Sequence, residues 1–217
     1  MKNKNSLLSK VFGWLFIGLL ITFVSGYLVS INENMMRDIF GSILFLIFVV
    51  AEVIIALVLR IFLDKLNKVA AILLYIVYTI LTGLTISTIF VAYKLPSIVI
   101  IFLVTSILFG IFALIGRFTK IDLSKFGIFL LIGIIAIIVL AIINAFVGSE
   151  KLDILTCIIG VVIFIGYIAY DVNRITKSEE MEGIEESNYP IIFAFDLYID
   201  FINLFIDLMR LFGDSND

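Results

Sequence analysis

Long stretches of apolar residues, separated by short polar segments, follow one another along the whole chain. Seven such stretches can be drawn, at about residues 11–30, 40–63, 69–93, 96–115, 126–147, 154–175 and 191–212. At a rise of about 1.5 Å per residue, each is long enough to cross a hydrocarbon core about 30 Å thick. The pattern predicts an all-α integral membrane protein with seven transmembrane helices. These form one domain over residues 1–217, with an N-terminal tail at about 1–10 and a polar loop at about 176–189.

The composition agrees with this pattern. Hydrophobic residues make up 63% of the 217 residues and charged residues 15%, and the mean hydropathy is +1.24. A soluble domain would carry about 25% charged residues. The sequence contains no phosphate-binding loop, HExxH motif, Cys/His metal cluster or nucleophile elbow. We therefore expect neither an enzyme nor a resident cofactor, and the lipid bilayer rather than a nucleic acid as the partner.

The basic residues between the stretches predict an orientation. With the N-terminus inside, the inner segments carry eleven Lys and Arg residues and the outer segments carry four. An excess of basic residues marks the cytoplasmic side, so we expect a cytoplasmic N-terminus and a C-terminus outside. The acidic loop at about 176–189 then lies in the cytoplasm. It is either a solvated connector or a vestibule that concentrates cations.

The last apolar stretch carries four polar side chains on one face. Asp196, Asp200, Asn203 and Asp207 recur at i, i+4, i+7 and i+11, which places them within about 60° on a helix. A carboxylate exposed to lipid costs at least about 2.5 kcal/mol. The stripe is therefore expected to face other helices or a water-filled cavity, with Asp207 in a local ion pair with Arg210.

Two carboxylates on different stretches are candidates for one site. Asp200 lies about ten residues into the last stretch, near mid-membrane. Asp171 lies at the cytoplasmic end of the sixth stretch and shares a helix face with Arg174. A short loop joins these two stretches, so we expect them to be antiparallel neighbours with Asp171 and Asp200 at similar depth. Asp196, one turn from Asp200, is either a second ligand on an entry path or a solvated side chain.

The second stretch adds two more ionisable residues. Glu52 has no obvious partner nearby in the sequence and is a functional candidate because a charge inside the membrane is costly. Arg60 either reaches the membrane interface as an anchor or supplies the counter-charge for carboxylates at its level.

The chemistry of paired carboxylates limits what such a site can bind. Two carboxylates close together in a low dielectric cannot both be ionised cheaply, so they share one proton or bind a cation. Oxygen ligands favour hard cations such as Ca²⁺. Histidine is absent from the sequence, so carboxylates would have to sense protons near neutral pH. The residues alone predict an intramembrane carboxylate site for protons or a hard cation.

Three segments resemble signatures of the Bax inhibitor family of transmembrane proteins. LYIDFINLFIDLMRLFG, at residues 197–213, is similar to the C-terminal signature of that family. YDVNRI, at 170–175, is similar to its sixth-helix signature, and TGLT, at 82–85, to its third-helix signature. The short loops and the lack of a tail resemble a bacterial member, which implies the bacterial plasma membrane as the location.

The resemblance implies a fold in which the last helix is central and the other six surround it. It also implies a pH-sensitive calcium leak whose sensor is a pair of aspartates, which fall on Asp171 and Asp200 here. An arginine near the end of the second helix is linked to this pair in the closed state; Arg60 matches it best, and Lys65 is a second possibility. Asp196 departs from the small or polar residue expected at its position, which makes the site more acidic.

Two other functional classes remain as alternatives. The first is a non-transporting regulator that binds a membrane protease or another membrane protein. The second is a proton-coupled transporter. Calcium flux through the purified protein in liposomes would separate the leak from the regulator, because a pure binding module gives no flux.

Overall fold

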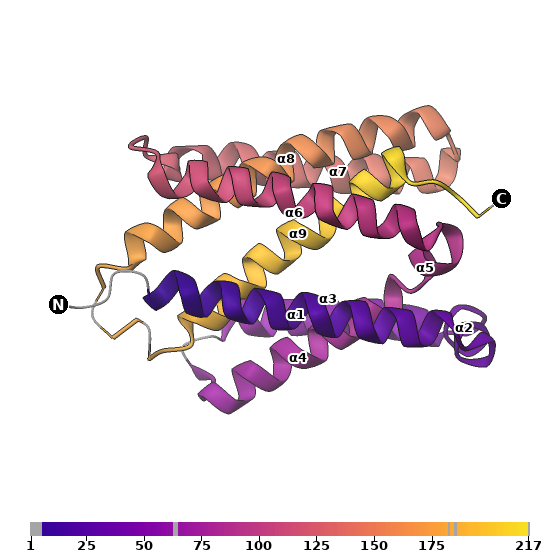
Figure 1. The fold of residues 1–217 in the computed structure, drawn as a ribbon, viewed down its shortest axis with the longest axis horizontal. Helices are drawn as coiled ribbons and strands as arrows, with labels where there is room; N and C mark the ends of the chain where they lie inside the picture. The colour runs from indigo at the N-terminus through magenta and orange to yellow at the C-terminus, as the bar shows by residue number, and fades with distance from the viewer. Residues whose placement is uncertain (1–5, 63–64, 182, 185, 217) are drawn as a thin grey trace. The chain divides into compact units, whose positions relative to one another are not determined.

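Helices make up the regular structure of the described residues. The structure is a computed structural model that describes residues 6–62, 65–181, 183–184 and 186–216. Its elements are α1 (Ser6–Ser30), α2 (Glu33–Phe40), α3 (Leu44–Ile61), α4 (Lys68–Thr85), α5 (Thr88–Ala92), α6 (Leu95–Phe118), the 3₁₀-helix η2 (Leu123–Phe126), α7 (Gly127–Val147), α8 (Glu150–Ser178) and α9 (Tyr189–Phe212) (Figure 1). The predicted all-α class is confirmed. Half of the predicted N-terminal tail, residues 1–5, and positions 63, 182 and 185 lie outside the described residues.

Six helices in the described ranges are long and apolar enough to cross a membrane, so the predicted count of seven is not confirmed. The six segments are Leu7–Ser30, Leu44–Ile61, Lys68–Ala92, Leu95–Phe118, Leu123–Val147 and Glu150–Ser178. The seventh predicted stretch forms α9, which has 24 residues but is not one of the six. All residues from 191 to 198 are buried. Such burial is that of a helix enclosed by protein rather than by lipid.

The third predicted stretch, 69–93, agrees with the span Lys68–Ala92, but two local features of the helices were not predicted. The second stretch was expected to start at residue 40, but α2 ends there and α3 begins at Leu44. The sequence reading missed α2, whose first turn is capped by Asn32 through a 3.2 Å bond from the Met35 amide. The third stretch breaks between α4 and α5, where the Ser87 hydroxyl donates to the Leu84 carbonyl at 2.7 Å.

The chain divides into two compact units, which are described separately. The first unit comprises residues 1–94, 179–198 and 215–217, and thus α1 to α5 with the first part of α9. Within it, α4 packs against both α1 and α3 (Figure 1). A glycine permits the close approach of α1 and α4, since a Cβ atom at Gly83 would lie 2.6 Å from the Thr22 carbonyl oxygen.

The second unit comprises residues 95–178 and 199–214, and thus α6, η2, α7 and α8 with the second part of α9. Within it, α8 packs against both α6 and α7 (Figure 1). A Cβ atom at Gly116 would lie 2.9 Å from the Cα atom of Ala169, so glycine is needed where α6 and α8 meet. Helix α8 therefore lies against both α6 and α7, and it fixes where the loop between them lies in the second unit.

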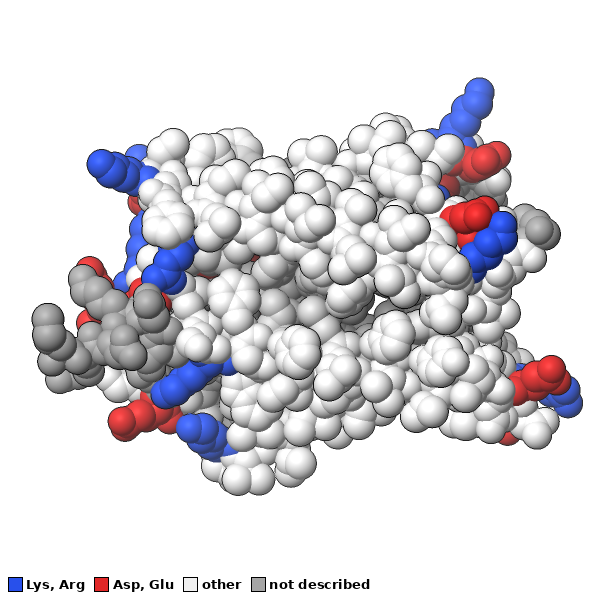
Figure 2. Space-filling model, viewed as in Figure 1, with Lys and Arg blue, Asp and Glu red and all other residues white. Residues whose placement is uncertain are grey.

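The charged side chains that can be seen in Figure 2 lie at the ends of helices. On the face drawn in Figure 2, blue and red atoms gather at helix ends, and the helix flanks between them are white. Many large apolar side chains on these flanks are exposed, among them Phe16, Leu46, Ile107, Ile132 and Val162. An exposed apolar flank of this extent is expected where a helix contacts lipid.

Candidate functional site

Three of the aspartates that the structure describes are buried. Asp171 on α8 is 5% exposed, and Asp196 and Asp200 on α9 are 6% and 4% exposed. The polar stripe of α9 therefore faces protein at Asp196 and Asp200, as the sequence predicts. A buried carboxylate must be paired, hydrogen-bonded or protonated, because its desolvation is otherwise too costly. Each of these three side chains is accordingly a candidate for proton or cation chemistry.

In the first unit, Asp196 forms an ion pair with Arg60. The Arg60 Nη2 atom lies 2.7 Å from Asp196 Oδ1. The Arg60 side chain is 55% exposed, so the ion pair joins a buried carboxylate, Asp196, to an exposed guanidinium. The guanidinium also lies 6.0 Å from the centre of the Phe195 ring. Arg60 thus pairs with a carboxylate of α9, and the competing candidate Lys65 lies instead over the ring of Phe62, at 5.7 Å.

Glu52 has partners that the sequence did not reveal. The Thr85 hydroxyl donates to Glu52 Oε1 at 3.0 Å, and the Thr82 hydroxyl lies 3.5 Å from Oε2. These two threonines are the first and last residues of the TGLT segment on α4, whereas Glu52 lies on α3. The contact holds the carboxylate between two neighbouring helices of the first unit. No local spacing rule links residues 30 or more positions apart, so only the fold shows this site.

In the second unit, Asp171 contacts the arginine one turn further along α8. Arg174 Nη1 lies 3.5 Å from Asp171 Oδ1, which agrees with the shared helix face predicted from their spacing. Between them in sequence, Asn173 donates to the Gly116 carbonyl oxygen at 3.1 Å and ties α8 to α6. Asp171 and Asp200 belong to the same unit and are both buried. Their pairing stays a prediction.

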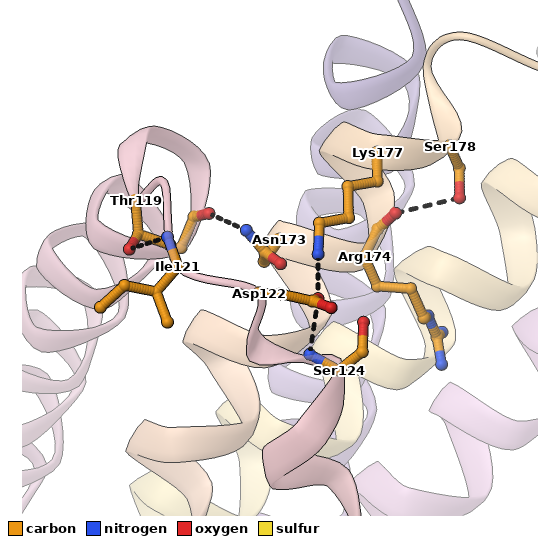
Figure 3. Close-up of polar contacts among 9 residues, drawn as sticks. Thr119, Ile121, Asp122, Ser124, Asn173, Arg174, Lys177 and Ser178 are labelled. Carbon is orange, nitrogen blue, oxygen red and sulfur yellow. Dashed lines mark hydrogen bonds and ion pairs between the residues drawn. The ribbon is translucent and has the colours of Figure 1, made fainter.

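The loop between α6 and α7 is held to the end of α8 by an ion pair (Figure 3). Lys177 Nζ contacts Asp122 Oδ1, and the Ser124 amide donates to the same oxygen at 3.2 Å. The hydrogen bond from Lys177, supported by Ser124, lowers the pKa of Asp122 to about 2. Asp122 therefore stays ionised at neutral and mildly acidic pH. Its ion pair with Lys177 does not change over that pH range, so Asp122 is not a candidate pH sensor.

At the other end of α8, Arg210 of α9 forms an ion pair with Asp153. The sequence predicted an ion pair of Arg210 with Asp207, three residues earlier on the same helix. It did not predict Asp153 on α8 as a partner of Arg210. Asp207 itself lies against Gly160, where a Cβ atom would collide with its carboxylate. The second part of α9 is therefore tied to the beginning of α8 by polar contacts.

No three His, Cys, Asp or Glu side chains lie close enough together to hold a metal ion among the residues that the structure describes. Calcium takes about six to eight oxygen ligands in proteins. A calcium ion at the expected ligands Asp171, Asp200 and Asp196 would therefore need backbone carbonyl or water oxygens as well. The calcium site stays a prediction.

The family of the protein follows from its similarity to known sequences. The family model described as inhibitor of apoptosis-promoting Bax1 matches residues 4–217. The chain belongs to the Bax inhibitor-1 family.

Relatives of this Bax inhibitor-1 family member occur in distant bacteria. The chain is 36% identical to the inner membrane protein YbhL of Escherichia coli over 212 residues, which cover 95% of this chain and 91% of YbhL. It is 38% identical over 218 residues to an uncharacterized protein of Borreliella burgdorferi, covering 99% and 94% of the two chains. It is also 34% identical over 132 residues to an uncharacterized membrane protein of Streptococcus pyogenes, covering 60% and 58%.

Membership in the Bax inhibitor-1 family confirms the resemblance found in three short segments of the sequence. The inner-membrane relative and the six apolar helices together show a bacterial multi-pass membrane protein that contacts the lipid bilayer. In this setting the buried aspartates are carboxylates inside a membrane protein, where ionisable residues are costly and are generally kept for function.

Proposed function

We propose that this Bax inhibitor-1 family protein is a pH-sensitive calcium leak channel whose gate is controlled by a proton shared between Asp171 and Asp200. The observation that supports this most directly is the burial of both carboxylates, one on each of α8 and α9, in a chain without histidine. Carboxylates kept inside a membrane protein bind protons or hard cations. The two kinds of ligand then compete for the same oxygens.

The proposed gate works through electrostatic repulsion. At low pH the shared proton satisfies both carboxylates and holds α8 and α9 together. At higher pH the proton leaves, and two like charges in a poorly solvated site repel. A bound calcium ion, a nearby arginine or a helix movement that admits water would each relieve the repulsion. Proton release therefore both creates a cation site and loosens the contact that closes the path.

Calcium flux in liposomes tests the proposal. Liposomes that contain the purified protein and a trapped calcium indicator are expected to take up calcium faster as the pH rises from mildly acidic to mildly alkaline. If one proton controls opening, the rate changes by at most about tenfold for each pH unit. A variant with Asp122→Asn should keep this response, because Asp122 is already ionised across the range. Flux no faster than in protein-free liposomes would favour the non-transporting regulator instead.

We also propose that the N-terminus lies in the cytoplasm and the C-terminus outside. The eleven basic residues on one side and four on the other support this orientation. Single cysteines in a Cys157→Ala background should therefore react differently with a membrane-impermeant reagent in intact cells. Ile31→Cys and Phe212→Cys, both at exposed positions, are expected to react, and Met181→Cys in the acidic loop to react only after permeabilisation. Reaction of Met181→Cys in intact cells would contradict the orientation.

A further inference from the structure

An apolar cavity of about 320 Å³ lies within the second unit, among α6, α7 and α8. Its size falls within the range of about 300–1,000 Å³ that is usual for ligand pockets. The residues that matter most for the argument are Ile115, Ile121, Phe126, Leu130, Gly166 and Tyr170. The cavity lies at the end of the unit where the loop between α6 and α7 contacts α8, as Figure 3 shows for that loop.

Gly166 of α8 lies in the wall of the cavity and lets Leu130 of α7 approach closely. A Cβ atom there would lie 2.8 Å from Leu130 Cδ2, so a larger side chain at position 166 must displace the lining. Phe112 of α6 and Thr119, which directly follows α6, both line the cavity and lie seven positions apart, which is about 10 Å along a helix axis. The cavity therefore extends from the level of the loop into the apolar part of the helices.

The lining favours a hydrocarbon chain. Apart from the hydroxyls of Thr119 and Tyr170, the side chains described around the cavity are apolar. Cavities with such a lining are poor sites for water. Ile115, Ile121 and Phe126 are also exposed, so the cavity borders on a helix surface that contacts lipid. The surrounding molecules are lipids, and their acyl chains match the lining.

The loop beside the cavity favours a negatively charged headgroup. Arg117, Lys120 and Lys125 lie on the segment 117–125, where Asp122 is the acidic residue. Asp122 is already paired with Lys177 from α8. Lys120 and Lys125 have exposed side chains that lie next in sequence to cavity residues. The segment thus offers positive charge to a phosphate at the mouth of the cavity.

We propose that this cavity binds an acyl chain of an anionic phospholipid from the surrounding bilayer, with the lipid headgroup at Lys120 and Lys125. The apolar cavity fixes the chain and the two lysines select the charge. The cavity is lined by Tyr170, the residue before Asp171, but the proposal does not depend on calcium conduction.

Fluorescence quenching by brominated lipids tests the site. The single tryptophan is first removed by Trp14→Phe, and a reporter is placed at the cavity by Phe126→Trp. The protein is then incorporated into phosphatidylcholine nanodiscs that contain increasing fractions of brominated phosphatidylglycerol or brominated phosphatidylcholine. Each lysine contact is expected to favour the anionic lipid by about fivefold. Equal quenching by the two lipids would overturn the proposal.

Matched variants locate the headgroup and the chain separately. Lys120→Gln with Lys125→Gln should bring the preference for phosphatidylglycerol close to one, whereas Lys151→Gln, an exposed lysine in the first turn of α8, should leave it unchanged. Gly166→Leu should abolish the saturable part of the quenching. Gly110→Leu should not, because a Cβ atom there meets nothing within 4 Å. An unchanged preference in the lysine variant, or unchanged saturable quenching in Gly166→Leu, would also overturn the proposal.

Discussion

Replacing either Asp171 or Asp200 with asparagine is expected to abolish the pH dependence of calcium leak. If the two carboxylates share one proton, removing either charge removes the repulsion that opens the gate. The wild-type response of up to about tenfold per pH unit should therefore become flat in each single variant. The double variant should be little worse than either single one, because the two residues act as one unit. Leak rates in liposomes across a pH series, with calcium binding measured on the same samples, give the comparison.

An exposed aspartate serves as the control for the two buried ones. Asp171 and Asp200 are almost fully buried, whereas Asp122 is exposed and ionised throughout the same pH range. Asp122→Asn breaks the contact with Lys177 yet should leave the pH response intact. A normal response in both Asp171→Asn and Asp200→Asn would show that the sensor lies elsewhere, with Asp196 and Glu52 as the next candidates.

The sequence predicted the helical class and most helices because apolar runs of spanning length leave few alternatives for a chain in a membrane. It failed where short polar segments decide the local structure. The helix α2 has only eight residues and begins at the Asn32 cap. It contains no apolar run from which hydropathy could predict it. The break between α4 and α5 depends on hydroxyl groups that bond to backbone carbonyls, as Ser87 does with Leu84. Hydropathy is insensitive to both features.

The site shows a similar division between local and distant contacts. Asp171 and Arg174 are three residues apart on one helix, so the spacing alone predicted their contact. The Arg60–Asp196 pair joins residues 136 positions apart, and charge and depth suggested only that Arg60 could meet a carboxylate. The contact of Glu52 with Thr85 gave no signal, because threonine in an apolar helix normally bonds to its own backbone. Distant polar partners are visible only once the helices are placed side by side.

Removing the Arg60 guanidinium is expected to raise calcium leak and to weaken its pH dependence. Asp196 is buried and lies one turn from Asp200 on α9, so Arg60→Ala removes the Arg60 counter-charge from a carboxylate close to the proposed sensor. The extra negative charge would repel Asp200 at any pH at which Asp196 is ionised. The loss of stability should lie between about 1 kcal/mol for an exposed pair and about 3–5 kcal/mol for a buried one, because Arg60 is only half buried. Arg60→Lys should restore part of both properties, since lysine keeps the charge but not the planar geometry.

A double-mutant cycle shows whether Arg60 acts through Asp196. If it does, Arg60→Ala combined with Asp196→Asn should leak less than Arg60→Ala alone, because the repelling charge is removed, and the thermal unfolding midpoints of the four proteins in detergent should show a coupling of about 0.5–3 kcal/mol. If Arg60 acts directly on the Asp171–Asp200 pair, Asp196→Asn should leave the leak unchanged, and the coupling should vanish. Lys65→Ala is the matched control, because Lys65 is the neighbouring cation and lies over Phe62. Wild-type leak in Arg60→Ala together with a raised leak in Lys65→Ala would assign the restraint on the gate to Lys65.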